Sequence, residues 1–312
     1  MLETFRGHLP ESEWYPAHEP GVTSRHIDLA DGERARVVEA GPDGGEVVVL
    51  VHGWACSAYF FRRLVPPLAA AGYRVVALDL RGHGASSRPM VAARYTATAM
   101  RDYVVAVLDG LGIARAHVIA HSLGGGVSLD LAAFVPARIR TLTLLAPVGL
   151  APVRFVTLGR LVTPVMAAPL VPYAVPRWSI PLLLRAMYGR EGRWASRAVD
   201  EYWAPTADPA FARALHALLH HYQFSPRNDA QLAAISAPTL VVLGDRDLLV
   251  RSRASGARAA AQGWPNITLT GAGHVLAEEV PDQVLAHLLP HLARRDAPAQ
   301  VHSPDAIHHV TE

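Results

Sequence analysis

The stretch that decides the fold is "HVIAHSLGGGVSL", His117 to Leu129. An apolar run ends at Ala120, a serine stands at Ser122, and three glycines from Gly124 to Gly126 precede a second apolar run. This order predicts a buried strand, a sharp turn at the serine and a helix. A serine that only turned the chain would not need glycines beside it, so the pattern also indicates close contact between backbone segments.

The composition indicates a globular chain. Its 312 residues suffice for about two domains or for one domain with a large insertion, and 51% of them are hydrophobic. The formal net charge is only +2 and no basic stripe stands out, which disfavours nucleic acid as a partner. The single cysteine, Cys56, has no partner for an internal disulfide, and the N-terminal residues lack the pattern of a signal peptide, so we expect a cytoplasmic protein. The apolar stretch Leu161 to Pro176 contains prolines and is shorter than the ~20 residues of a membrane span, so we expect no such span.

Short β-branched runs alternate with longer amphipathic runs along the chain. The predicted strands are Glu46–His52, Arg74–Leu80, Ala116–His121, Arg140–Ala146, Thr239–Asp245 and Asn266–Thr270. The predicted helices are Ala58–Ala71, Thr96–Leu111, Ser122–Val135, Arg251–Ala261 and Pro281–Arg294. The alternation predicts an α/β fold with a mostly parallel, doubly wound sheet, and the near absence of polar positions within the strands indicates helices on both faces.

The alternation stops between residues 148 and 234, where prolines, aromatic residues and Leu/Ala-rich pieces occur without a convincing strand. We expect this segment to be a helical insertion between two parts of the sheet domain, residues 1–147 and 235–294. Residues 295–312 are expected to form a flexible tail. Before the first buried strand, "TSRHIDLADGERARVVEAG" alternates around Asp31-Gly32, which predicts antiparallel edge strands.

The turn at Ser122 fits the context of a nucleophile, a strand followed by a sharp turn and a helix. The positions two residues before and after the serine must be small, and Ala120 and Gly124 meet that requirement. The strict G-x-S-x-G string is not met, because alanine replaces the first glycine. The alternative interpretation is a serine that only caps the helix N-terminus.

A nucleophilic serine needs a base, and the base needs a carboxylate that orients it. His274 lies in "LTGAGHVLAEEVP", just after the last predicted strand. Asp245 and Asp247 follow the strand before it, in "VVLGDRDLLV". Because parallel strands end at one edge of the sheet, the serine, an aspartate and the histidine are expected to meet there.

The oxygen that gains charge during such a reaction needs hydrogen-bond donors. In "LVHGWACSAYF" a strand ends at His52, and the backbone N–H of Trp54 is expected to face the serine together with that of Leu123. The alternative is an ordinary turn at the end of the strand. The later stretch "LDLRGHGASS" is interpreted as structural, a glycine turn in which Asp79 and Arg81 tie loops together.

Taken together, "HGW", "DLRGHGASS", "AHSLGG", "GDRD" and "GAGHVLAEE" resemble the α/β-hydrolase fold family in order and spacing, from about residue 25 to residue 294. The resemblance implies a helical cap over residues 148–234 and a catalytic set of Ser122, Asp247 and His274. It favours Asp247 over Asp245, because the family's acid usually stands three residues after the strand-ending glycine, here Gly244.

The resemblance also implies the chemistry. Related dehalogenases and epoxide hydrolases carry an aspartate at the position of Ser122, so the serine favours an esterase-like or lipase-like enzyme that forms an acyl-enzyme. Trp54 and Leu123 would supply the oxyanion N–H groups, and no cofactor or metal is required. The alternatives are hydrolysis of carbon–carbon bonds, perhydrolase chemistry, and a ligand-binding or accessory protein with slow turnover.

Only the expected cap carries a signal about the substrate. Between Gly149 and Arg177 its sole charges are Arg154 and Arg160, so we expect an apolar cleft for a small hydrophobic ester or acyl substrate, unless these residues only pack on the core. The same apolar residues allow transient contact with a lipid surface. The sequence identifies no individual substrate-binding residue and no oligomeric state.

His216 with His220, and His287 with His291, have a spacing that zinc accepts. Neither pair has a third ligand nearby, so we interpret both pairs as polar faces of surface helices. Cys56 is expected to be a small buried side chain.

Overall fold

The structure is a computed structural model that describes residues 7–167, 170, 175–190 and 192–294. The expected flexible tail, residues 295–312, lies outside the described residues. Within the described residues no helix is long and apolar enough to cross a membrane.

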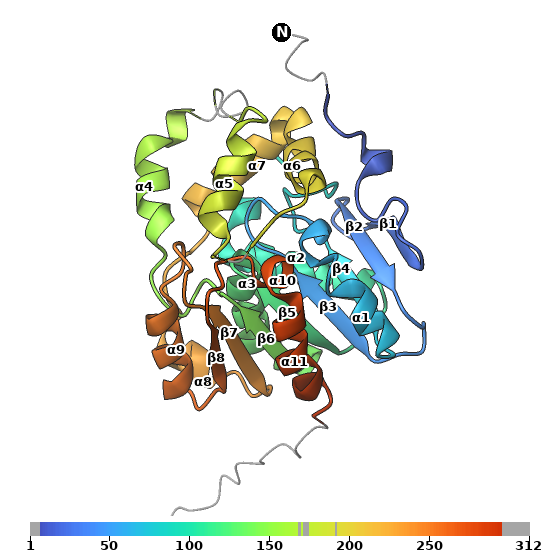
Figure 1. The fold of residues 1–312 in the computed structure, drawn as a ribbon, viewed down its shortest axis with the longest axis vertical. Coiled ribbons are helices and arrows are strands. Elements are labelled where there is room, and N and C mark those ends of the chain that lie inside the picture. Colours follow the sequence, from blue (N-terminus) through green and yellow to red (C-terminus); the bar gives the residue numbers. More distant parts are fainter. Residues whose placement is uncertain (1–6, 168–169, 171–174, 191, 295–312) are drawn as a thin grey trace, which may run out of the picture.

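An eight-stranded sheet forms the centre of the molecule, in the order β1-β2-β4-β3-β5-β6-β7-β8 (Figure 1). The pairs β1–β2 and β2–β4 are antiparallel, and all the other pairs are parallel. The sheet thus confirms the expected α/β class and the antiparallel hairpin at one edge. The strands are β1 Val22–Asp28, β2 Arg34–Ala40, β3 Val47–Val51, β4 Arg74–Leu78, β5 Ala116–His121, β6 Ile139–Leu145, β7 Thr239–Gly244 and β8 Asn266–Leu269.

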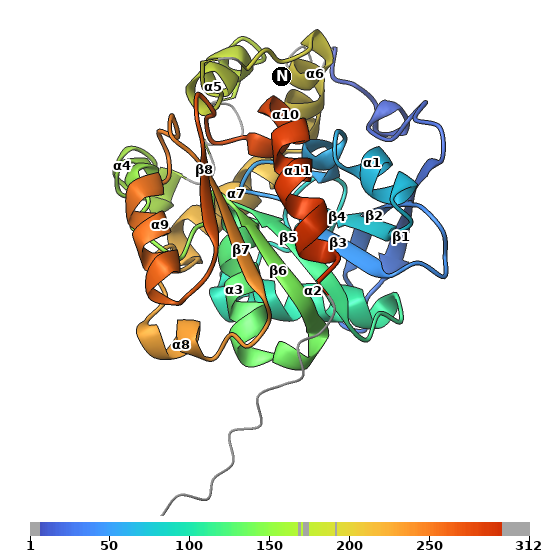
Figure 2. The ribbon, with the colours of Figure 1, turned by 60° about the horizontal axis from the view of Figure 1, so that its bottom comes forward.

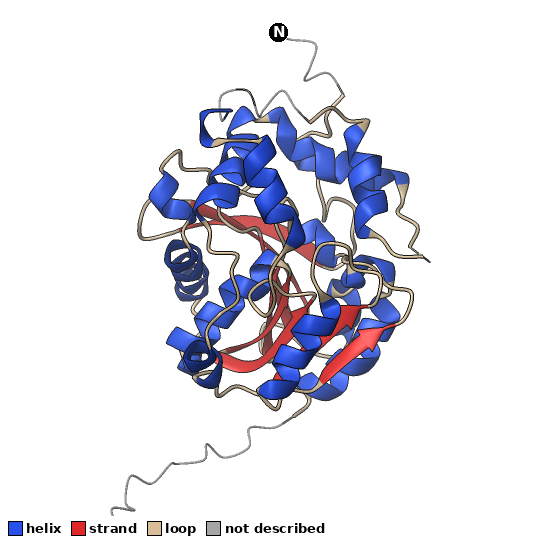
Figure 3. Cartoon of the chain, turned by 90° about the vertical axis from the view of Figure 1, so that its left-hand side faces the viewer, coloured by secondary structure: helices blue, strands red, loops and turns tan. Residues whose placement is uncertain are grey.

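Helices cover both faces of the sheet (Figure 3). Successive residues of a strand point to opposite faces, so Val49 and Val51 enter one hydrophobic core while Val48 and Leu50 enter the other. The first core lies under α2 Ala97–Gly110 and α3 Leu123–Phe134, and the second lies under α1 Val65–Ala70 and α11 Pro281–Leu292. Figure 2 shows α11 in front of the strands. Burial on both faces explains why the strands lack polar alternation.

Two local differences from the sequence prediction have clear causes. The predicted helix Ala58–Ala71 is divided into a 3-10 helix, Ala58–Phe61, and α1, because Pro66 and Pro67 have no N–H and are accommodated only in a first helical turn. The four-residue helix α10, Leu276–Glu279, was not predicted, since one turn leaves no periodic pattern.

Between β6 and β7 the described elements are helices, which we call the β6–β7 connection. It contains α4 Arg154–Val162, α5 Ser179–Met187, α6 Ser196–Trp203, α7 Pro209–His221 and α8 Asp229–Ala233. The remaining helix, α9 Ser252–Ala261, lies between β7 and β8. In Figure 1 the helices α4 to α7 form a layer above the sheet. The helical content of residues 148–234 agrees with the absence of strand patterns in that part of the sequence.

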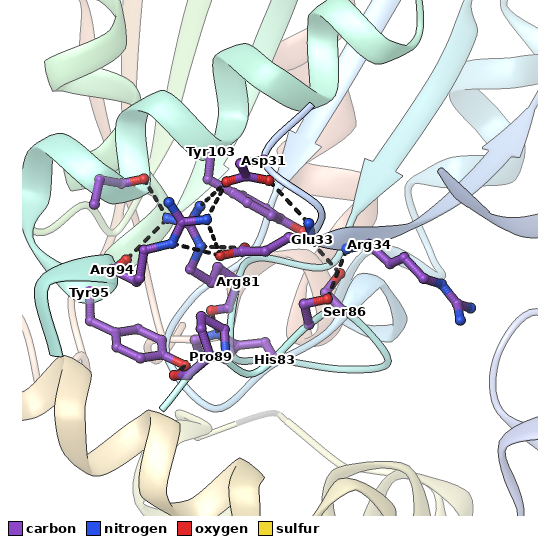
Figure 4. A network of polar contacts seen from close by, with 12 residues as sticks. Asp31, Glu33, Arg34, Arg81, His83, Ser86, Pro89, Arg94, Tyr95 and Tyr103 are labelled. Atoms are coloured by element: carbon purple, nitrogen blue, oxygen red, sulfur yellow. Dashed lines mark hydrogen bonds and ion pairs between the residues drawn. The ribbon is translucent and has the colours of Figure 1, made fainter. Parts of the chain in front are cut away.

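The turn after β4 is held by a polar network, as expected for a structural segment (Figure 4). The Arg81 guanidinium donates to Glu33 Oε2 at 2.6 Å and to the carbonyl of Ala99 at 2.7 Å. Asp79 is fully buried, pairs with Arg36 at 3.1 Å and accepts from the Ala58 N–H at 2.7 Å. Burial alone would raise the pKa of Asp79, but Arg36 and the donated N–H groups outweigh burial and lower it. Both side chains therefore tie loops together.

The apolar residues of the β6–β7 connection differ from the expectation of a cleft lining or a packing face. One side of its helices is buried, with Val156, Ile180 and Leu184 in contact with the cores. A second set of large apolar side chains is exposed instead: Leu158, Leu161, Val162, Val165, Met166, Leu170, Trp178, Leu182 and Leu183. This set neither packs on the cores nor is enclosed in a cleft, and its exposure agrees with the third interpretation of these residues, contact with a lipid surface.

Candidate active site

Ser122 stands between β5 and α3 in a strained backbone conformation, with φ 50° and ψ −114°. A non-glycine residue adopts such angles only where its surroundings enforce them. The Ser122 N–H donates to the carbonyl of Leu145, while its own carbonyl accepts from Gly126 and Val148. The ends of β5 and β6 thus hold the turn, and only 5% of Ser122 is exposed.

The glycines around Ser122 are required by backbone contacts. A Cβ atom on Gly124 would lie 2.3 Å from the carbonyl oxygen of Val51, and one on Gly125 would lie 2.7 Å from Pro147 Cβ. A Cβ on Gly53, in the loop after β3, would lie 3.1 Å from Ser122 Cβ and 2.6 Å from His121 Nδ1. Because these glycines have no side chains, the β3 loop can lie in close contact with the serine turn.

His274 connects the serine to a carboxylate. Its Nε2 lies 2.9 Å from Ser122 Oγ, and its Nδ1 lies 2.7 Å from Asp247 Oδ2. The side chain of His274 is 3% exposed and that of Asp247 is 0% exposed. The three side chains predicted from separate strand ends therefore form one hydrogen-bonded chain that is shielded from water.

Two aspartates follow β7, and they do different things. Asp247 Oδ1 accepts from the N–H groups of Leu249 at 2.7 Å and Val250 at 2.9 Å, which leaves Oδ2 for the imidazole. Asp245 is exposed and accepts from the Gly271 N–H at 2.7 Å. Asp245 thus holds the loop that leads to the histidine, while Asp247 contacts the histidine itself.

The segment that carries His274 is fixed by contacts that the sequence analysis missed. The Glu279 carboxylate on α10 accepts from the Gly273 N–H at 2.7 Å through one oxygen and from the Gly189 N–H at 2.8 Å through the other. The His274 N–H donates to the carbonyl of Met187 at 2.7 Å. One carboxylate therefore holds the histidine loop against the end of α5. The only sequence signal was the pair of acids in "AEE".

Leu123 follows Ser122 directly, and the β3 loop lies close to the serine at Gly53. Leu123 is the first residue of α3, where a backbone N–H has no acceptor within the helix. The Trp54 ring donates from Nε1 to the carbonyl of Leu215 on α7 at 3.2 Å, which holds the β3 loop under the β6–β7 connection. Leu123 adjoins Ser122 and Trp54 follows Gly53, which lies close to the serine turn, so the oxyanion role of their two N–H groups stays a prediction.

Two buried histidines support this arrangement, and neither was recognised from the sequence. His52 accepts from the Leu80 N–H through Nε2 and donates through Nδ1 to the carbonyl of Gly53 at 2.7 Å, which fixes the β3 loop. His121 donates through Nε2 to the carbonyl of His274 and stacks on Phe60. Burial lowers the pKa of both imidazoles, so both are neutral at pH 7.

Comparison with known proteins agrees with this architecture. Residues 46–170 match the sequence profile of the alpha/beta hydrolase fold family. The solved structure of a membrane phospholipase A superimposes with a TM-score of 0.73 and 25% identity, covering 87% of this chain and 86% of that one. The chain has the α/β-hydrolase fold.

Two curated relatives share part of this sequence. The dihydrolipoyllysine-residue acetyltransferase component of the acetoin cleaving system from Pseudomonas putida is 41% identical over 121 residues, 38% of this chain and 31% of that protein. Epoxide hydrolase A from Mycobacterium tuberculosis is 44% identical over 105 residues, 34% of this chain and 32% of that protein. The match thus spans about a third of the length of either relative.

The two histidine pairs with a spacing that zinc accepts pack against the backbone or lie at the surface. His216 and His220 both contact the carbonyl of Thr163, at 3.0 and 2.7 Å. His216 and His291 are buried, which corrects the expectation of polar surface faces, whereas His287 is exposed. The described residues contain no group of three or more His, Cys, Asp or Glu side chains arranged to hold a metal. Cys56 is buried, as expected, and burial raises the pKa of its thiol.

Proposed function

We propose that this protein is a serine hydrolase that cleaves a hydrophobic carboxylic ester through an acyl-enzyme intermediate. The observation that carries the proposal is the hydrogen-bonded chain from Asp247 through His274 to Ser122 at a strained turn. In this proposal Ser122 is the nucleophile, His274 the general base and Asp247 the group that orients the imidazole.

The first half of the reaction forms the acyl-enzyme. Ser122 Oγ attacks the ester carbonyl carbon while its proton passes to His274 Nε2, 2.9 Å away. The carbonyl oxygen becomes an oxyanion, which the N–H groups of Trp54 and Leu123 stabilise; losing one such donor typically costs ~3 kcal/mol. The C–O bond then breaks, and the alcohol leaves with the proton from His274.

The second half releases the acid. Water attacks the acyl carbon and gives a proton to His274, and the second tetrahedral intermediate collapses by returning that proton to Ser122 Oγ. The Asp247 carboxylate stabilises the imidazolium in both halves. The cycle consumes one water and yields an alcohol and a carboxylic acid, and it needs no cofactor or metal.

The nucleophile itself argues against epoxide opening, the activity in the name of one relative. A serine that opened an epoxide would form an ether, which an imidazole base and water do not hydrolyse. The same serine forms an ester with an acyl group, and an ester is readily hydrolysed. The similarity to the solved membrane phospholipase A also supports acyl chemistry.

The test is hydrolysis of p-nitrophenyl esters from acetate to long acyl chains by the purified protein. We expect a burst of p-nitrophenol, and we expect Ser122→Ala to lower kcat by at least about 10³-fold. Ser128→Ala is the matched control, since Ser128 is a buried serine of the same helix. Equal rates in the wild-type protein and Ser122→Ala would contradict the proposal.

The other outcomes point to the remaining candidates. Turnover of a vinylogous diketone without ester turnover would indicate carbon–carbon bond hydrolysis, and peracid formation would indicate a perhydrolase. Tight binding of an apolar ligand without turnover of any substrate would indicate a ligand-binding protein.

A further inference from the structure

Large apolar side chains are exposed along α4, α5 and the described residues between them. Of the exposed large apolar side chains in the described part of the chain, most belong to residues 158–183. Met166 is 86% exposed, Leu161 75% and Trp178 71%. We call these exposed residues, Leu158 to Leu183, the α4–α5 face. An apolar area of this kind marks an interaction surface more often than a free one.

The charged residues within the sequence of this face are arginines, of which Arg177 pairs with Asp200 of α6 at 2.7 Å. The sequence contains no Asp or Glu between Asp130 and Glu191. The β6–β7 connection begins within this stretch and contributes five arginines to it: Arg154, Arg160, Arg177, Arg185 and Arg190. Arg160 is used internally, since its guanidinium donates to the carbonyls of Leu219 and Tyr222. Arg185 and Arg190 are exposed, and neither forms an ion pair with any carboxylate of the described residues.

A cavity of about 480 Å³ lies next to this face and gathers these charges. Arg185 at the end of α5 and Arg190 after it line the cavity together with Arg246 from the loop after β7. Trp194 and the exposed Leu248 complete the wall. Arg246 is also exposed and has no ion-pair partner among the described side chains. Three guanidinium groups around one hollow, none of them ion-paired within the described part of the chain, favour an anion with several oxygens, such as a phosphate.

We propose that the α4–α5 face docks on a bilayer that contains anionic phospholipid. Its apolar side chains enter the interfacial region, and the arginines of the cavity bind lipid phosphate. The charge pattern favours this partner over a second copy of the chain, because a symmetric contact through this face would bring the arginines of both copies together. The proposal does not depend on the reaction assigned to Ser122.

The test is flotation of the full chain with vesicles in buffer of physiological ionic strength. The Ser122→Ala variant is used, so that no lipid is consumed and the result is independent of the catalytic proposal. We expect the protein to float with vesicles of phosphatidylcholine and phosphatidylglycerol, at least fivefold more than with phosphatidylcholine alone. High salt should reduce the bound fraction, because it screens the arginines.

Two pairs of variants locate the surface. Leu161→Ser combined with Met166→Ser should lower the bound fraction at least fivefold, whereas Phe134→Ser should not. Phe134 is 58% exposed but is the last residue of α3, which begins at Leu123 and packs against α2 and α8. Arg185→Gln with Arg246→Gln should abolish the preference for phosphatidylglycerol. Arg25→Gln with Arg34→Gln, on the edge strands β1 and β2, is the matched control and should retain it.

Several results would overturn the proposal. One is the absence of flotation with either kind of vesicle, and another is an equal loss of binding in the Phe134→Ser control. Inorganic phosphate that binds the cavity without any vesicle binding would indicate a soluble anionic ligand. A dimer in the absence of lipid that Leu161→Ser with Met166→Ser dissociates would assign the face to a second copy.

Discussion

Asp245 and Asp247 are two residues apart, and single atoms decide between them. The residue types and the positions of the strand ends allowed either aspartate to be the acid that orients His274. The resemblance to a family pattern favoured Asp247. The structure adds the reason: the N–H groups of Leu249 and Val250 hold one oxygen of Asp247, so the other meets His274 Nδ1. Such a turn depends on local backbone geometry that spacing alone does not specify.

This difference predicts the behaviour of a matched pair of variants. In Asp247→Asn the amide no longer accepts from Nδ1–H reliably, so the imidazole loses its working tautomer, and we expect kcat to fall by about 10⁴-fold. Asp245→Asn should change kcat by less than about tenfold, because Asp245 only holds the Gly271 backbone. Steady-state kinetics on the best p-nitrophenyl ester compares the two variants. Equal losses in both would contradict the assigned role of Asp247.

At the scale of elements, the strands were predictable and the short helix α10 was not. Buried parallel strands leave continuous β-branched runs in the sequence, which is why β3 to β7 were located to within a residue or two. The role of α10 depends on contacts with Gly189 and Gly273, which are 90 and 6 residues away from Glu279. No local pattern records such a contact, so the support of His274 had to come from the structure.

We predict that α10 acts on the reaction through the position of His274. Glu279→Ala removes the acceptor of the Gly273 N–H, so the histidine loop should shift, and kcat should fall by about 10- to 100-fold with a smaller change in KM. Asp282→Ala, at an exposed position at the start of α11, is the control and should retain kcat. Circular dichroism should show both variants folded. An unchanged kcat in Glu279→Ala would show that Glu279 does not position His274 for the reaction.

The whole molecule contains several histidines that burial keeps neutral. Burial lowers the pKa of His83 to about 3 and that of His291 to about 4, and it also lowers the pKa of His52 and His121. In the unfolded chain a histidine titrates near pH ~6.5. Between that pH and the lower folded pKa, the unfolded state binds protons that the folded state does not, so stability falls as the pH falls.

We therefore predict a steep loss of stability on mild acidification. Each of these histidines contributes up to about 1.4 kcal/mol per pH unit below pH ~6.5 to the decrease in unfolding free energy. Glu201, whose pKa burial raises, offsets part of this decrease. Urea unfolding at pH 7 and pH 5.5 measures the effect, and His291→Gln should make the pH dependence shallower. An unfolding free energy that is the same at both pH values would show that these side chains do not remain neutral in the folded protein.

The tie between Glu279, Gly189 and Gly273 also limits how the protein can be recombined. A Cβ on Gly273 would lie 2.3 Å from the carbonyl oxygen of Met187, and one on Gly189 would lie 2.2 Å from that of Gly271, so the two backbones fit only as a pair. Grafting the β6–β7 connection from another protein would separate that pair, even with every side chain of the Ser122 site retained. The two segments thus depend on each other structurally. An active chimaera therefore has to exchange residues 187–190 together with residues 271–279.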